Sequence, residues 1–254
     1  MTDYQAQCET TLLEGQWDQA QQAALAWARH PAAGTARDPR PHFILNVIHL
    51  LRGAFAEAWN IHSECLQESV DIVLVKEWIE GFVARQPEQA SVHLVMGLFL
   101  AQSGQSEQSI ASYKESSKLA PQSAHPHYFL AQIHERANHL EMAIKEYREA
   151  VRLDPSYAPA RTNLGVAYQE QGRLDMAIPQ YREVIKLHPN DSVAHANLAC
   201  ALAEQGKLEP ALQSYKEALR LNPKDAAVHF ALGDFYETRR DRKSVVRERV
   251  LASV

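Results

Sequence analysis

The chain has 254 residues and a formal net charge of −5, with 46% hydrophobic and 22% charged residues. This is the balance of an ordinary soluble protein, and no apolar run approaches the roughly 20 residues of a membrane-spanning helix. No basic segment followed by an apolar one opens the sequence, so no signal peptide is visible, and we expect a cytoplasmic protein without a membrane partner.

Residues 1–34 are predicted to form a diverged helical hairpin. Their segment GQWDQA (15–20) is similar to GRLDMA (172–177), which lies in a regular part of the chain. The first helix is polar and poorly patterned, as expected for a terminal unit that caps a stack. The Pro-, Ala- and Gly-rich residues 30–41 are predicted to be a loop.

Residues 42–86 contain three helical stretches, of which only two can form a hairpin. Gly53 and Ala58 are the small residues that pair the first two stretches, whereas Trp59 and Pro87 fit a pairing of the last two. One helix is therefore unpaired, and the sequence leaves open which one. Such a break in phase usually re-aims a helical stack.

From residue 87 onward the sequence repeats with a period of about 34 residues, which is typical of stacked helical hairpins. The period links five prolines: Pro87, Pro121, Pro155, Pro189 and Pro223. It also links tyrosines, leucines and small residues: Tyr113, Tyr147, Tyr181 and Tyr215; Leu130, Leu164, Leu198 and Leu232; Gly97, Ala131, Gly165, Ala199 and Gly233.

Each residue type has a physical reason for its place in the repeat. The small residue after each leucine lets two antiparallel helices approach closely. Glycines are expected to end the first helices with a left-handed backbone, at Gly104, Gly172 and Gly206. Alanines on the second helices are expected to fit under the first helices, at Ala143, Ala177 and Ala211, with Ser109 at that place in the earliest copy. Pro179 and Pro210 are predicted in the first turns of second helices.

This pattern resembles the tetratricopeptide repeat family. Seven residues of one unit fall on the signature places of that family: Leu164, Gly165, Tyr168, Gly172, Ala177, Tyr181 and Pro189. The resemblance implies an all-α fold, a right-handed α-solenoid of antiparallel helix hairpins. Residues 1–89 would be a diverged N-terminal segment with one unpaired helix, and residues 90–240 four regular units plus the first helix of a further unit.

Residues 241–254 break the pattern. The segment DRKSVVRERV (241–250) is either a charged capping helix or non-native sequence. In the second case we expect the natural protein to continue past Arg240, so that this chain is an N-terminal fragment.

No motif for catalysis or metal binding emerges. Phosphate-binding, dinucleotide-binding and nucleophile-elbow glycine motifs are all absent. The motif HExxH is approached at residues 134–138, but Asn138 replaces the second histidine. The three cysteines form no CxxC pair and are interpreted as small buried side chains in a reducing compartment. We therefore predict no catalytic residue, no metal and no cofactor.

Four histidines occupy one equivalent place in four units: His93, His127, His195 and His229. Neighbouring helices lie about 8–10 Å apart, whereas zinc needs each nitrogen at about 2.0–2.1 Å. The four histidines therefore cannot share an ion in a regular stack. A half-buried packing role is predicted for them.

The charge distribution argues against nucleic acid as a partner. Residues 1–240 contain more acidic than basic side chains, and no basic stripe with interleaved aromatic residues is present. The acidic excess gives a weak preference for basic or neutral partners.

In the family, the first helix of each unit lines a concave groove that binds an extended peptide or a helix. Carried over place by place, the resemblance implies the following groove residues: Tyr128, Gln132, Glu135, Asn163, Val166, Gln169, Asn197, Cys200, Asp234 and Glu237. Asn163 and Asn197 lie one period apart and could form an asparagine ladder, or simply tighten the packing between units. Uncharged residues stand where a carboxylate clamp would have charged ones, at Thr162, Val193 and Ala196. This argues against a co-chaperone that binds the carboxy-terminal acids of chaperones.

The resemblance therefore implies a non-catalytic scaffold or adaptor that binds a protein or peptide in its concave groove. The alternative is the substrate-recognition arm of a larger enzyme, such as a glycosyltransferase, whose catalytic domain would follow residue 240. Self-association through the exposed C-terminal end of the stack is a further possibility.

Overall fold

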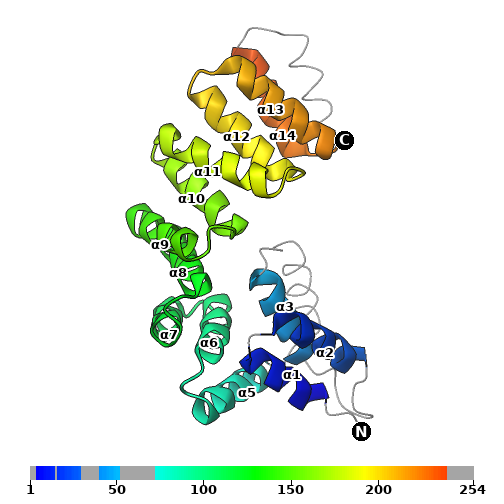
Figure 1. Ribbon diagram of the computed structural model, residues 1–254, viewed down its shortest axis with the longest axis vertical. Helices are drawn as coiled ribbons and strands as arrows, with labels where there is room; N and C mark the ends of the chain where they lie inside the picture. The colour runs from blue at the N-terminus through cyan, green and yellow to red at the C-terminus, as the bar shows by residue number, and fades with distance from the viewer. Residues whose placement is uncertain (1–3, 15, 30–39, 52–71, 239–254) are drawn as a thin grey trace. The chain divides into compact units, whose positions relative to one another are not determined.

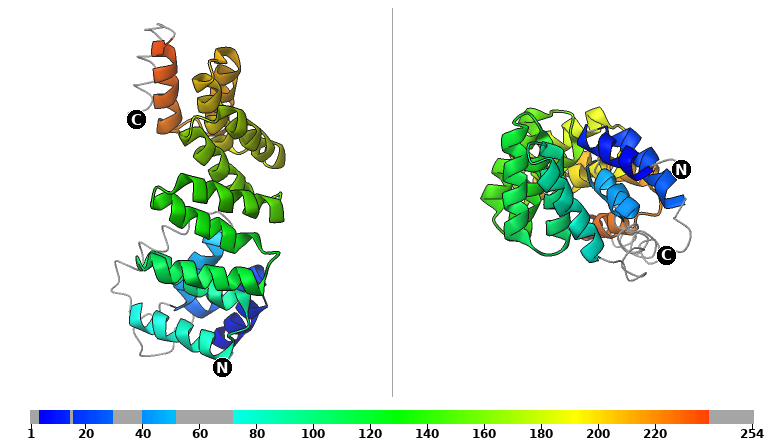
Figure 2. Two further views of the ribbon diagram at one scale, coloured as in Figure 1. Left: turned by 90° about the vertical axis from the view of Figure 1, so that its left-hand side faces the viewer. Right: turned by 90° about the horizontal axis from the view of Figure 1, so that it is seen from below.

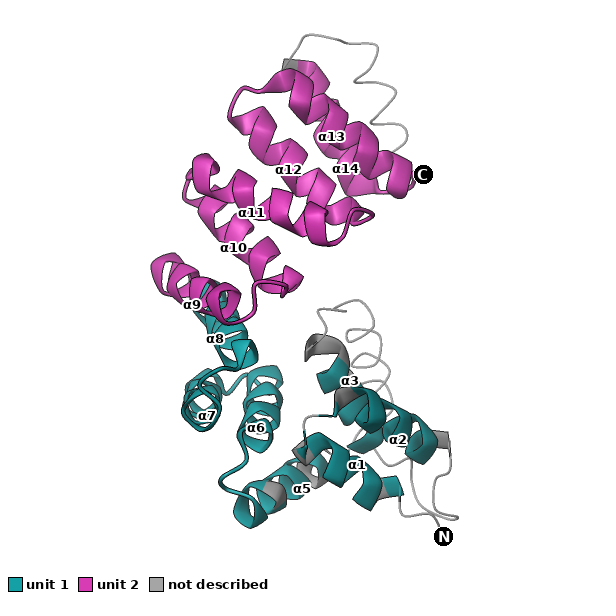
Figure 3. Ribbon diagram, viewed as in Figure 1, with its two compact units in different colours: residues 1–137 teal, residues 138–254 magenta. Residues whose placement is uncertain are grey.

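The computed structural model describes residues 4–14, 16–29, 40–51 and 72–238 (Figure 1). All regular secondary structure in these residues is helical. The chain divides into two compact units, residues 1–137 and residues 138–254 (Figure 3). The predicted all-α class and the solenoid of helix hairpins are confirmed.

The structure describes seven helices of unit 1, all of which end before residue 138. They are α1 (Tyr4–Leu13), α2 (Trp17–Arg29), α3 (Arg40–Leu51), α5 (Ile72–Arg85), α6 (Ala90–Gln102), α7 (Ser106–Leu119) and α8 (Ala124–Arg136).

 Two helical hairpins are present in the described part of unit 1. α1 and α2 form one antiparallel hairpin and α6 and α7 another, while α6 also contacts α1, α5 and α8.

Unit 2 continues the repeat with six described helices. They are α9 (Leu140–Leu153), α10 (Ala158–Glu170), α11 (Leu174–Leu187), α12 (Ser192–Glu204), α13 (Leu208–Leu221) and α14 (Ala226–Thr238). α10 pairs with α11 and α12 pairs with α13, and each second helix also contacts the first helix that follows it. Figures 1 and 2 show the helices of this unit following one another in chain order, and the contacts of α9 with α10, of α11 with α12 and of α13 with α14 make consecutive helices neighbours. First and second helices therefore alternate along the chain.

The close approach of paired helices depends on the small residue of the repeat. A Cβ atom built on Gly165 would lie 2.6 Å from Cε1 of Tyr181, and one on Gly97 would lie 2.4 Å from Cε1 of Tyr113. Both tyrosines are buried, so neither ring has free space to move into. The predicted role of the small residue in helix approach is confirmed in both units.

The second-helix alanines also take their predicted places. Ala143, Ala177 and Ala211 have no exposed surface. At the same place in the earliest copy, the buried Ser109 hydroxyl donates a hydrogen bond to the carbonyl of Gly97, with an oxygen–oxygen distance of 2.7 Å. The serine is therefore accommodated because a first-helix carbonyl accepts its proton.

The predicted left-handed residues end three first helices. Gly104, Gly172 and Gly206 have φ angles of 75°, 70° and 81°. In the second of the four regular units Asn138 takes this place with a φ angle of 60°. Asparagine is the residue other than glycine that tolerates this conformation best, so the turn is kept although the glycine is absent.

One prediction about proline is wrong. Pro210 is the third residue of α13 and lies in its first turn, but Pro179 is the sixth residue of α11 and lies inside the helix. Because proline has no N–H, the backbone bond that residue 179 would donate to the carbonyl of Asp175 is missing. The helix nevertheless runs on to Leu187.

Several predictions lie outside the described residues. These concern Gly53, Ala58 and Trp59 in the pairing of residues 42–86, most of the loop at residues 30–41, and residues 241–254. Cys65 also lies there, whereas Cys8 is fully buried in α1, as expected for a small apolar side chain. Burial raises the pKa of the Cys8 thiol to about 12, so it stays protonated and unreactive.

Candidate functional site

The first helices of unit 2 each have one buried and one exposed stripe. On α10 the buried stripe includes Leu164 and Ala167, and on α12 it includes Leu198 and Ala201. The opposite stripe follows helical spacing and consists of half-buried and exposed side chains. We call this stripe the first-helix face, and its residues are Asn163, Val166, Gln169 and Glu170 on α10, Val193, Asn197, Cys200 and Glu204 on α12, and Phe230, Asp234 and Glu237 on α14.

A hydrogen-bonded chain crosses this face between α10 and α12. The hydroxyl of Tyr181 donates to Oε1 of Gln169 at 3.0 Å, and Nε2 of Gln169 donates to Oε1 of Glu204 at 2.6 Å. Tyr181 comes from the second helix α11, so its hydroxyl reaches past the first-helix layer to the face. The chain fixes the Gln169 amide and joins two consecutive units.

The predicted asparagines differ in their contacts. Nδ2 of Asn163 donates to the hydroxyl of Tyr147 at 3.2 Å, which ties α10 to α9. No hydrogen bond joins the half-buried amide of Asn197 to any other residue that the structure describes. Asn163 therefore has a packing contact, while the amide of Asn197 keeps its full hydrogen-bonding capacity for a ligand.

Cys200 occupies the same face one turn after Asn197. Its Sγ lies 3.3 Å from the hydroxyl of Tyr215 on α13. Burial raises the pKa of the Cys200 thiol, and the nearby charge of Glu204 raises it further. The side chain is therefore a neutral hydrogen-bonding group and not a nucleophile.

Two exposed apolar side chains on this face were not predicted as binding residues. Phe230 on α14 is 56% exposed and Val193 on α12 is 54% exposed. The signal was present in the sequence, because each lies four residues before a predicted groove residue, Asp234 and Asn197 respectively. Val166, the apolar residue that was predicted, is half-buried on α10.

In unit 1 the predicted groove residues have a different setting. Tyr128 on α8 has no exposed surface, and its ring packs edge-on against Phe129. Its hydroxyl accepts a hydrogen bond of 3.0 Å from Nε2 of the half-buried Gln132. Glu135 is also half-buried. A ligand would reach the ring of Tyr128 only after its neighbours move aside.

The equivalent histidines do more than pack. Nε2 of His195 lies 3.0 Å from the carbonyl oxygen of Pro189, six residues earlier, and His93 and His229 repeat this contact with Pro87 and Pro223. A carbonyl oxygen can only accept, so Nε2 carries the proton. Arg161 stands at the same place of its unit and donates from Nε to Pro155 at 2.7 Å.

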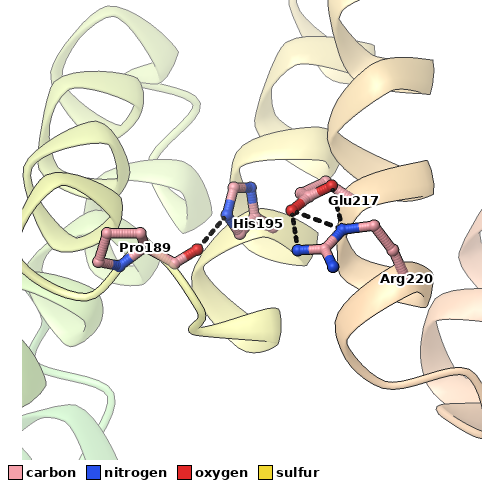
Figure 4. A network of polar contacts seen from close by, with 4 residues as sticks. All are labelled: Pro189, His195, Glu217 and Arg220. Atoms are coloured by element: carbon pink, nitrogen blue, oxygen red, sulfur yellow. Dashed lines mark hydrogen bonds and ion pairs between the residues drawn. The ribbon is translucent and has the colours of Figure 1, made fainter.

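Figure 4 shows the surroundings of His195. The imidazole of α12 lies between the Pro189 carbonyl and the carboxylate of Glu217, which is paired with Arg220 on α13. The hydrogen bond from Arg220 lowers the pKa of the Glu217 carboxyl, and the charges of Arg220 and His195 lower it further. The His195 contact ties α12 to the turn before it, and the charge of His195 acts on the Glu217–Arg220 pair of α13.

Within the described part of the chain, no three of the residue types histidine, cysteine, aspartate and glutamate lie close enough together to hold a metal ion. No described helix combines the length and the apolar character needed to cross a membrane.

Family models match the regular part of the chain. A model described as a TPR repeat matches residues 136–172 and 199–238. Three models described as a tetratricopeptide repeat match residues 158–191, 180–213 and 90–123. Among curated proteins, no sequence matches this chain.

Solved structures of repeat proteins are similar in fold. YrrB, described as a TPR protein with an unusual peptide-binding site, is 18% identical, with a TM-score of 0.60 over 68% of this chain and 90% of that one. MamA is 25% identical, with a TM-score of 0.56 over 62% of this chain and 92% of that one. PilF of Pseudomonas aeruginosa is 15% identical, with a TM-score of 0.61 over 83% and 88%.

The structural and sequence matches agree with the geometry of the hairpins, from the glycine–tyrosine approach to the left-handed turns. The chain belongs to the tetratricopeptide repeat family.

Proposed function

We propose that this protein is a non-catalytic interaction scaffold that binds a peptide segment of a protein partner on the first-helix face of unit 2. The observation that carries this proposal is the exposed stripe shared by α10, α12 and α14, which combines amide, carboxylate and apolar side chains at helical spacing. The first helices of three successive units present this stripe, so a bound segment would contact several repeat units at once.

The polar groups of the face suit an extended backbone. The Asn197 amide offers both a donor and an acceptor, so it can bind one peptide unit through its N–H and its carbonyl together. Gln169 is already held by Tyr181 and Glu204, so its ordering costs a ligand little conformational entropy. Interfaces of this kind obtain affinity from a few anchoring residues and register from the hydrogen bonds around them.

The test is selection of binding peptides from a random 12-residue library displayed on phage, with the purified full chain as bait. Selected peptides are then synthesised with a fluorescent label and titrated by anisotropy. We expect Asn197→Ala to weaken binding by about fivefold, the value of one neutral hydrogen bond. Glu183→Ala on α11 is the control, because it removes a half-buried polar side chain from a second helix, where among the described residues it forms an ion pair only with Lys186 of the same helix.

Equal binding by Asn197→Ala, by Phe230→Ala and by the parent chain would place the peptide elsewhere and contradict the proposal. The thermal melt of each variant is measured alongside, so that a loss of binding is interpreted only where the fold is retained.

A further inference from the structure

The first-helix face carries enough chemistry to define the class of peptide. Resting on the proposed function, we propose that its ligand is a peptide segment that combines apolar side chains with lysine or arginine, the apolar side chains covering Val193 and Phe230 and the cations facing Glu204, Asp234 and Glu237.

The apolar half of the face lies toward the amino-terminal ends of α12 and α14. Val193 is the second residue of α12 and Phe230 the fifth of α14, and more than half of each side chain is exposed. By helical spacing Val193 shares its stripe with Asn197 and Phe230 shares its stripe with Asp234. Exposed large aromatic side chains beside polar groups are characteristic anchors of binding surfaces.

The charged half of the face is uniformly acidic. Over their whole lengths α10, α12 and α14 contain four carboxylates, Glu170, Glu204, Asp234 and Glu237, and a single cationic side chain, Arg161. The guanidinium of Arg161 is engaged by the carbonyl of Pro155 and by Oε1 of Gln180 on α11. Charge complementarity therefore favours a cationic ligand.

The position of these carboxylates runs against the helix dipole. Second helices follow the dipole rule, with an acidic first turn and a basic last turn, as Glu209 and Arg220 do in α13. In α10 and α12 the last residue is Glu170 or Glu204, and no basic residue lies in the last turn. Carboxylates at the negative ends of helices repel the carbonyl groups there. A bound lysine or arginine would offset both negative contributions at once.

Carboxylates of different helices also act on the same tyrosine hydroxyls. Burial raises the pKa of the Tyr215 hydroxyl, its contact with Cys200 raises it further, and the charges of Glu204 and Asp234, from two different helices, act in the same direction. Burial likewise raises the pKa of Tyr181, with contributions from Glu204 and Glu170. The carboxylates of α10, α12 and α14 therefore act on the same hydroxyl-lined side of the unit.

The same charges argue against a second copy of the chain as the occupant. A symmetric dimer through this face would bring two surfaces together that each carry Glu204, Asp234 and Glu237. Like charges brought together in an interface are strongly unfavourable. A peptide with complementary charge meets no such repulsion.

The experiment compares three labelled 12-residue peptides with the purified full chain by fluorescence anisotropy. The first peptide contains leucine and lysine, the second leucine and glutamate, and the third serine and lysine. All three share one irregular pattern of places, in which glutamate replaces lysine in the second peptide and serine replaces leucine in the third. We expect the leucine–lysine peptide to bind at least tenfold more tightly than the other two. Its affinity should fall as the salt concentration rises from 50 to about 500 mM, because screening weakens exposed charge pairs.

Variants then assign the two halves of the face. The triple variant Glu204→Gln, Asp234→Asn, Glu237→Gln should weaken the leucine–lysine peptide about tenfold, since exposed ion pairs contribute a few-fold each. Glu204→Gln keeps an oxygen that accepts from Gln169, so the hydrogen-bonded chain is preserved. Phe230→Ala should weaken the same peptide about tenfold through loss of its anchor. The controls Glu183→Gln and Met176→Ala on α11 remove matched groups from a second helix and should change nothing.

The outcomes separate this inference from the proposed function. Tight binding of the leucine–glutamate peptide that Phe230→Ala abolishes would keep the face as a peptide site and overturn its basic specificity. Binding that none of the face variants alters would overturn both proposals. If sedimentation showed a dimer that Phe230→Ala dissociates, the occupant of the face would be a second copy. If a chain ending at Thr238 bound the leucine–lysine peptide tenfold more tightly than the full chain, the occupant would be residues 239–254. Either result overturns the inference.

Discussion

The two units use the repeat places of the first-helix face in different ways. Leu94 in unit 1 and Phe230 in unit 2 stand at one equivalent place of the repeat, yet Leu94 is 3% exposed and Phe230 is 56% exposed. In unit 1 the first helix α6 is contacted by the N-terminal helices α1 and α5 as well as by α7 and α8. We attribute the burial of Leu94 to these additional helices, whereas the equivalent place is open on α14.

This difference shows that a repeat place does not by itself define a binding residue. The side chain at that place contributes to the core where another helix covers it, and to a binding surface where none does. Leu98 and Asp234 make the same point one turn further on, because Leu98 is buried and Asp234 is exposed. The covered helix α6 is apolar at these places, whereas the open helix α14 carries both apolar and acidic residues there.

The largest effect is expected for Gly165→Leu. The new side chain would overlap the ring of Tyr181, whose Cε1 lies 2.6 Å from the Cβ position, so we expect a loss of about 3 kcal/mol in the free energy of unfolding. Hydrogen exchange resolved by peptide should show lost protection in α10–α13. Gly81→Ala is the control, since nothing lies within 4 Å of its Cβ position. Retained stability in Gly165→Leu would contradict the repeat register.

The pair Leu94→Ala and Phe230→Ala tests the comparison of the units directly. Removing the buried Leu94 side chain should cost about 2–3 kcal/mol, because a cavity remains in the core of unit 1. Removing the exposed Phe230 side chain should change the free energy of unfolding by less than about 1 kcal/mol. Urea denaturation of both variants measures the difference. Equal losses would show that α14 is covered in solution as α6 is.

A smaller difference is expected between Asn163→Ala and Asn197→Ala. Asn163 donates to Tyr147, so its loss should cost about 1 kcal/mol. Asn197 has no such bond among the described residues, and its replacement should leave the melting temperature nearly unchanged while peptide binding falls. If Asn197→Ala lowered stability more than Asn163→Ala, Asn197 would be a packing residue and the ladder interpretation would fail.

The smallest effect concerns pH and should be alike in the two units. The pKa of Glu217 in unit 2 and of Glu115 in unit 1 is lowered by hydrogen bonds from Arg220 and Lys118. A lowered folded pKa means that the stabilisation is present above the unfolded pKa, about 4.3, and is lost as the pH falls through the folded value. Glu217→Gln should therefore melt slightly below the parent at pH 7 and together with it at about pH 2. A gap that persisted at low pH would exclude the charge as its cause.

The sequence predicted the repeat architecture because its signals are local and periodic. The glycine–tyrosine approach and the left-handed turns each depend on a few residues within one hairpin, so the residue types specify them. Asn138 shows that residue type alone does not identify every turn, since it adopts the left-handed conformation that glycine adopts in the other units.

Exposure could not be predicted in the same way. Whether Leu94 or Phe230 meets water depends on helices that lie far away in the sequence, such as α1 over α6. The contact of Tyr147 with Asn163, and of Tyr181 with Gln169, likewise required the packing of two helices to be known. Tyr128 was predicted from its repeat place alone, and its full burial reflects neighbours that the period does not encode.

The tyrosine hydroxyls that reach the first-helix face have an optical consequence. All four tryptophans of the chain lie between residues 17 and 78, in unit 1, while unit 2 contains only tyrosines as strong near-ultraviolet chromophores. Tyr181 and Tyr215 each contact a residue of the face directly. A change in near-ultraviolet circular dichroism at tyrosine wavelengths on addition of a ligand, with unchanged tryptophan emission, would therefore report occupation of the face without any label.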